Sequence, residues 1–131
     1  MRIDSDALLL VTGALLLSVA AFTGFVQART ERGSAEEVRW RVVHNGGTAG
    51  GVQLLALSAV WARLAGSSDF AGPIALCLAM STLLFFVGPL LKALSRARSG
   101  NLVLWAGAVA SLPAYIGLIL LAITDHGSGT V

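Results

Sequence analysis

Four long apolar stretches, separated by short charged segments, dominate the pattern of this chain. They cover residues 7–28, 42–62, 70–91 and 99–124, and none contains an aspartate, glutamate, lysine or arginine. Each is long enough to cross a bilayer as a helix, which takes about 20 residues. Because backbone groups in lipid must be hydrogen-bonded within their own segment, the pattern predicts helices. We therefore expect an all-α integral membrane bundle of four transmembrane helices, forming one domain over residues 1–131.

The composition agrees with a membrane protein. Of the 131 residues, 56% are hydrophobic and only 12% are charged, whereas about a quarter of the residues in soluble domains are charged. The formal net charge of +2 then indicates loop topology rather than a nucleic-acid partner. We expect membrane lipid around the chain and no nucleic acid. A single cysteine, Cys77, excludes an intramolecular disulfide, and its place within an apolar stretch favours a buried packing role.

The distribution of basic residues predicts the orientation in the membrane. The connectors 29–41 and 92–98 would lie on the same side of a four-span bundle, and they hold seven of the nine lysines and arginines. Cytoplasmic connectors carry an excess of Lys and Arg. We therefore expect a multi-pass protein of the cell (inner) membrane, with these two connectors in the cytoplasm and both termini outside.

The start of the second apolar stretch carries the candidate chemistry. His44 is the only histidine within any of the four stretches, and a run of glycines follows it. On a helical wheel, Gly47, Thr48 and Gly51 lie within about 60° of the direction of His44. Ionisable residues within membrane spans are functional candidates by default.

Two interpretations of the glycines are open. The spacing Gly47-x-x-x-Gly51 is typical of helices that pack closely in membranes. Alternatively, the small residues clear a flat shelf on which a porphyrin lies, with its iron bound to the imidazole. The second interpretation predicts a haem b cofactor, with His44 as metal ligand and Gly47, Thr48 and Gly51 as cofactor-binding residues. The other histidine, His126, belongs to the tail at the opposite membrane face, so we expect one axial ligand per chain.

Other polar residues within the stretches are candidates for catalysis or for packing. Tyr115 follows Pro113, where it is either a catalytic group or a structural tyrosine at a proline bend. Asn45 is the second catalytic candidate, although it lies to the side of His44 on the wheel. Gln53 suits either a hydrogen bond between helices or a ligand contact. The stretches contain no acidic residues, which argues against a proton-coupled transporter.

Two motifs resemble the styrene oxide isomerases, a family of small four-helix membrane enzymes. The first begins with Gly33-Ser34-Ala35-Glu36, continues with Trp40-Arg41-Val42-Val43-His44 and ends in the glycine-rich helix start. The second is Leu112-Pro113-Ala114-Tyr115, which is similar to the last helix of that family. The four-span layout is shared as well.

The resemblance implies a concrete activity. It implies a homo-oligomer, a trimer, with haem b held between subunits and His44 as the axial ligand. Ferric iron would act as a Lewis acid on the oxygen of a small apolar epoxide, giving a carbonyl compound without net redox change. The family carries an asparagine six residues after the ligand and a tyrosine on the third helix. Here those positions align with Gly50 and Leu90.

Three hypotheses follow from the sequence. The first is an isomerase-like enzyme that uses ferric haem as a Lewis acid. The second is a non-catalytic haem protein, such as a carrier, a sensor or a redox subunit. The third is a small membrane scaffold without a cofactor, in which the glycines serve helix packing alone.

Overall fold

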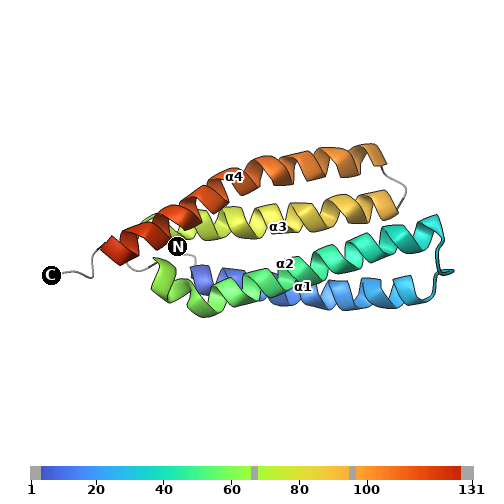
Figure 1. The fold of residues 1–131 in the computed structure, drawn as a ribbon, viewed down its shortest axis with the longest axis horizontal. Helices are drawn as coiled ribbons and strands as arrows, with labels where there is room; N and C mark the ends of the chain where they lie inside the picture. Colours follow the sequence, from blue (N-terminus) through green and yellow to red (C-terminus); the bar gives the residue numbers. More distant parts are fainter. Residues whose placement is uncertain (1–3, 66–67, 95–96, 128–131) are drawn as a thin grey trace.

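The computed structural model describes residues 4–65, 68–94 and 97–127, and its regular elements are four helices. They are α1 (Ser5–Ala28), α2 (Ala35–Ala65), α3 (Ala71–Ala93) and α4 (Ala97–Gly127). Helices α1 and α2 form one antiparallel hairpin, α3 and α4 form a second, and the hairpins lie side by side (Figure 1). The all-α fold expected from the apolar stretches is therefore confirmed.

Three of the four helices are long and apolar enough to cross a membrane, judged over the described residues. They are α1, α3 and the Arg98–Ile123 part of α4. Helix α2 has 31 residues, which exceeds the length that a span requires. However, His44, Asn45, Gln53 and the glycines make it less apolar than the other three. The helix that carries the candidate site is thus the most polar of the bundle.

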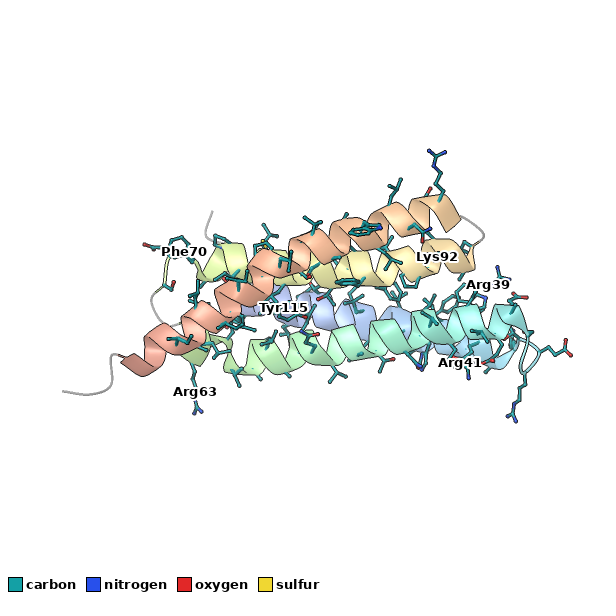
Figure 2. All side chains as sticks on the ribbon, turned by 45° about the horizontal axis from the view of Figure 1, so that its top comes forward. Arg39, Arg41, Arg63, Phe70, Lys92 and Tyr115 are labelled. Carbon is teal, nitrogen blue, oxygen red and sulfur yellow. The ribbon has the colours of Figure 1, made fainter. Side chains whose placement is uncertain are left out.

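The two ends of the bundle differ in charge. The start of α1, the end of α2, the start of α3 and the end of α4 lie at one end of the bundle, while the opposite ends of the four helices lie at the other (Figure 1). Arg39, Arg41 and Lys92 are found at the second end, and Arg63 at the first (Figure 2). The fold thus gathers the two basic connectors on one side, as the expected orientation requires. That this side is cytoplasmic stays a prediction.

Helix α2 starts seven residues earlier than the expected boundary at residue 42. The side-chain oxygen of Ser34 accepts a hydrogen bond from the backbone N–H of Glu37, at 3.0 Å. This N-cap, together with the carboxylates of Glu36 and Glu37 in the first turn, stabilises a helix start. The preceding Gly33 has φ +80°, which glycine adopts without strain and which lets the chain turn. The expected connector 29–41 is therefore partly helical, because its residues from Ala35 onward, including Glu36 and Arg41, belong to α2.

The other boundaries lie close to those expected. Helices α1 and α3 begin and end within two residues of the expected stretches. Helix α4 begins at Ala97 and continues to Gly127, beyond the expected 99–124. Pro113 lies inside α4, and the helix changes direction in its C-terminal half (Figure 1), in agreement with the expected bend.

The distribution of apolar side chains suits a lipid environment. Leucines and one phenylalanine, including Leu16, Leu54 and Phe86, are buried between the helices. Yet many large apolar side chains are exposed, and Trp105 on α4 is 73% exposed. Such a surface would be a liability in water, whereas in a bilayer it contacts the acyl chains.

Glycines let the two helices of each hairpin approach closely. A methyl group on Gly51 would lie 2.9 Å from the carbonyl oxygen of Gly13, between α2 and α1. A methyl group on Gly100 would lie 2.7 Å from the carbonyl oxygen of Gly88, between α4 and α3. Small residues that allow such backbone contact are typical of membrane helix pairs. Each hairpin is therefore a tightly packed unit.

Candidate functional site

His44 lies on α2 and faces α1, where its ring makes one short hydrogen bond. The distance from its Nδ1 to the carbonyl oxygen of Ala20 is 2.7 Å. A carbonyl oxygen can only accept a hydrogen bond, so Nδ1 carries the proton. In the neutral imidazole this leaves a lone pair on Nε2, which forms no hydrogen bond within the described part of the chain. Nε2 is thus chemically ready to bind a metal.

Gly24, one turn after Ala20 on α1, lies directly against the imidazole. A methyl group at Gly24 would come within 2.8 Å of both Cε1 and Nδ1 of His44. The ring is therefore held by the hydrogen bond that it donates to Ala20 and by close packing against Gly24 on the next turn of α1. These two contacts fix the orientation of the imidazole.

The other two predicted glycines face the interior of the chain. A methyl group on Gly47 would lie 2.8 Å from the ring of Phe86, and one on Gly51 would lie 2.7 Å from the side chain of Leu17. Both glycines are buried. Close helix packing therefore explains these two residues, as the first interpretation of the stripe proposed. A haem shelf that includes them stays a prediction.

Thr48 and Asn45 flank His44 on α2. The Thr48 hydroxyl donates to the carbonyl oxygen of His44 at 2.9 Å, a backbone contact that is common for threonine in membrane helices. Thr48 is half-buried and Asn45 is exposed. Both remain close to the imidazole in sequence and on the helix surface.

Gly50 faces α3 rather than His44. A methyl group at Gly50 would lie 2.6 Å from Cγ2 of Thr82. A side chain larger than hydrogen is therefore excluded unless Thr82 moves. At this position the resemblance would place an asparagine. In this chain, Thr82 of α3 occupies the space that such a side chain would need.

Tyr115 pairs with Gln53 and not with His44. The Nε2 of Gln53 donates to the phenol oxygen of Tyr115 at 2.7 Å, which joins α2 to α4 near the middle of the bundle (Figure 2). Nine residues separate Gln53 from His44, about 13.5 Å of helix rise. Of the two catalytic candidates, Asn45 therefore lies beside the histidine and Tyr115 lies about two and a half turns away.

A polar cluster joins α1 and α2 above the histidine, toward the connector. The side chain of Gln27 donates to a carboxylate oxygen of Glu37 at 2.9 Å. The same Glu37 oxygen lies 3.7 Å from Nε of Arg41. Their relative exposures differ greatly, since the Glu37 side chain is 12% exposed and the Arg41 side chain is 52% exposed. A cation is thus held one turn from His44, with part of its surface open.

An apolar groove lies at the opposite end of the bundle. It has a volume of about 610 Å³ and is lined by Ser68, Phe70 and Ile74, together with α4 residues from Pro113 to Leu121. Apart from one serine hydroxyl, its lining is apolar. It offers no ligand suited to iron and is separate from the His44 site.

Comparison with known proteins identifies the family. The family model described as styrene oxide isomerase matches residues 5–124, almost the entire chain and all four helices. The chain belongs to the styrene oxide isomerase family. No match was found among curated proteins or among solved structures. The family match confirms the resemblance seen in the two sequence motifs, and it makes this chain an isomerase-like membrane protein.

A styrene oxide isomerase family member with this arrangement offers one histidine as a metal ligand. Within the described residues, no group of three or more His, Cys, Asp or Glu side chains could hold a metal ion. A porphyrin brings its own four nitrogens and needs the protein for an axial ligand only. The donor set around His44 therefore fits a haem better than a bare ion.

Two residues that hold the imidazole of the candidate site are not among those predicted from the sequence. Ala20 and Gly24 orient the imidazole from α1, yet they lie 24 and 20 positions before His44. A signal for Gly24 existed, because a glycine inside an apolar span often marks a close approach. For Ala20 there was none, since its backbone carbonyl makes the contact.

Proposed function

We propose that this protein binds haem b through His44 and converts an epoxide into its carbonyl isomer. The observation that carries the proposal is the 2.7 Å hydrogen bond from Nδ1 of His44 to the carbonyl oxygen of Ala20. Metal-binding histidines usually donate their other ring N–H to a carbonyl or carboxylate, which fixes the tautomer and makes the ligand nitrogen more basic. The family match supplies the reaction class.

The chain's own residues would hold and orient the cofactor. His44 would bind the iron through Nε2, while Ala20 and Gly24 keep the ring from rotating. When bound, ferric haem supplies a Lewis acid that polarises the oxygen of an epoxide. His44 would be the one protein ligand that this chain supplies to the iron, and the substrate would be a small apolar epoxide. The apolar surroundings exclude water, which would otherwise add to an opened epoxide and give a diol.

The protein would act as a homo-oligomer in the cell (inner) membrane. His44 is half-buried on α2, so a cofactor held by it would also contact whatever packs against the α1–α2 hairpin. A second copy of the chain is a natural candidate for that neighbour, and the family resemblance implies a trimer. The surrounding partner is membrane lipid.

A non-catalytic haem protein is the second candidate, and one observation favours it. Gly50 packs against Thr82, and Leu90 stands where the resemblance would place a tyrosine. The two polar groups that would orient an epoxide are therefore replaced. A carrier, a sensor or a redox subunit needs the haem ligand but neither of those groups.

An optical titration tests haem binding. The detergent-purified protein is titrated with haemin, and we expect a Soret band with one equivalent per chain. His44→Ala should abolish the band, while the matched control His126→Ala should retain it. A band that survives in His44→Ala would rule out the ligand assignment. Absence of any band in the wild type would favour a scaffold without cofactor.

An epoxide panel then separates the two haem functions. Ferric protein is mixed with aryl and alkyl epoxides, and carbonyl products are followed by gas chromatography together with the Soret position. The isomerase proposal predicts a spectral shift and a carbonyl isomer with at least one epoxide. Haem binding without shift or product would favour the carrier, sensor or redox function.

A further inference from the structure

His44 lies beside a surface of small residues and one cation on the α1–α2 hairpin. On α1, Gly24 contacts the imidazole, and Ala21 and Ala28 share the face of Gly24 at helical spacing and are exposed. On α2, Arg41 lies one turn from His44, toward the basic end of the bundle, and is exposed. This surface combines small apolar residues, one imidazole nitrogen and one cation.

Glu37 holds Arg41 in place without using all of the hydrogen-bond donors of its guanidinium. Its Nε lies 3.7 Å from Glu37, a separation longer than a hydrogen bond. The guanidinium has five N–H donors, so donors remain for a second anion. Glu37 would itself repel such an anion, but it is largely covered and already accepts a hydrogen bond from Gln27. The arrangement orients Arg41 while leaving half of its side chain exposed.

We propose that Arg41 binds a carboxylate of the cofactor held by His44, and so sets which edge of the macrocycle points toward the basic connectors. The inference rests on the proposed function. Arg41 is three residues before His44, about 4.5 Å along the helix axis. A guanidinium pairs with a carboxylate through two parallel hydrogen bonds. The carboxylates would then lie at the membrane surface, and the apolar part of the ring would lie in the hydrocarbon.

Haemin affinity tests the role of Arg41 without any measurement of activity. Apoprotein is titrated with haemin, and the dissociation constant is read from the Soret band. Arg41→Ala should weaken binding about tenfold or more, as expected for loss of a charged hydrogen bond. Arg41→Lys keeps the positive charge but not the planar guanidinium, so its dissociation constant should lie between those of the wild type and Arg41→Ala. Arg39 is the matched control, because it lies at the same end on the opposite side of α2 (Figure 2), and Arg39→Ala should bind as wild type.

A ligand without carboxylates gives an independent test, whose deciding comparison is made on the folded wild-type protein. The dimethyl ester of haemin should bind the wild type about tenfold more weakly than haemin, and should bind Arg41→Ala as well as it binds the wild type. Equal affinity of the wild type for both ligands would overturn the role of Arg41, even where His44→Ala shows that the axial ligand is correct. If the wild type binds neither ligand, or binds them independently of His44, the proposed function fails and this inference fails with it.

Discussion

Gly24 and His44 are in such close contact that a single methyl group cannot be placed between them. A Cβ atom at position 24 would lie 2.8 Å from two atoms of the imidazole, and the ring cannot withdraw without losing its bond to Ala20. We predict that Gly24→Ala lowers stability by about 1–3 kcal/mol, as overpacking does, and weakens haemin binding at least about tenfold, since a shift of 1.4 kcal/mol suffices. Soret titration and thermal unfolding in detergent measure the two effects.

Gly46 provides the matched control for this substitution. A methyl group there meets no atom within 4 Å, and alanine favours a helix over glycine by up to about 1 kcal/mol. Gly46→Ala should therefore keep the haemin affinity of the wild type, and its stability should be equal to that of the wild type or higher. Wild-type affinity in Gly24→Ala would show that the α1 contact does not control the imidazole.

The pair Gly50 and Thr82 predicts a rescue. We expect Gly50→Asn alone to destabilise the protein by about 1–3 kcal/mol, because its Cβ would meet Cγ2 of Thr82 at 2.6 Å. Thr82→Ala removes that atom, and it costs little because the Thr82 hydroxyl bonds only the carbonyl of Leu78 on its own helix. The double variant should recover most of the loss, with a coupling of about 1 kcal/mol or more in a double-mutant cycle. Strictly additive effects would contradict the contact.

The hydrogen bond between Gln53 and Tyr115 predicts a structural role for the tyrosine. Tyr115→Phe and Gln53→Leu should each cost a similar amount, with a coupling of about 0.6 kcal/mol, typical of polar pairs between membrane helices. Neither change should alter the Soret band of the haemin-bound protein. A catalytic tyrosine would behave differently: Tyr115→Phe would abolish epoxide turnover while Gln53→Leu preserved it.

Much of the fold was readable from hydropathy, because charge-free stretches of bilayer length leave few alternatives to helices. The start of α2 was not readable in the same way. The charge pattern predicts a connector over residues 29–41, whereas Ser34 caps a helix that begins at Ala35 within that range. A hydropathy pattern marks where lipid begins, whereas capping marks where the helix begins.

The candidate site was only half predictable. A helical wheel correctly places Gly47 and Gly51 on the side of α2 that carries His44, but it cannot say which neighbour covers them. That neighbour is Phe86 for one and Leu17 for the other. The orientation of His44 depends on a backbone carbonyl of α1, which has no signature in side-chain identity. Contacts between distant segments therefore decide the parts that the sequence leaves open.

The orientation of the bundle gives the last prediction, for which the single cysteine is an advantage. In a Cys77→Ser background, Arg32→Cys and Asp69→Cys each place one thiol at an exposed position, in the α1–α2 and the α2–α3 connector respectively. A membrane-impermeant maleimide should label Asp69→Cys in intact cells, and should label Arg32→Cys only after permeabilisation, because we expect the basic connectors to face the cytoplasm. Cys77→Ser without an added thiol is the control for background labelling. The reverse labelling pattern would mean that the bundle has the opposite orientation, with Arg41 at the outer side of the membrane.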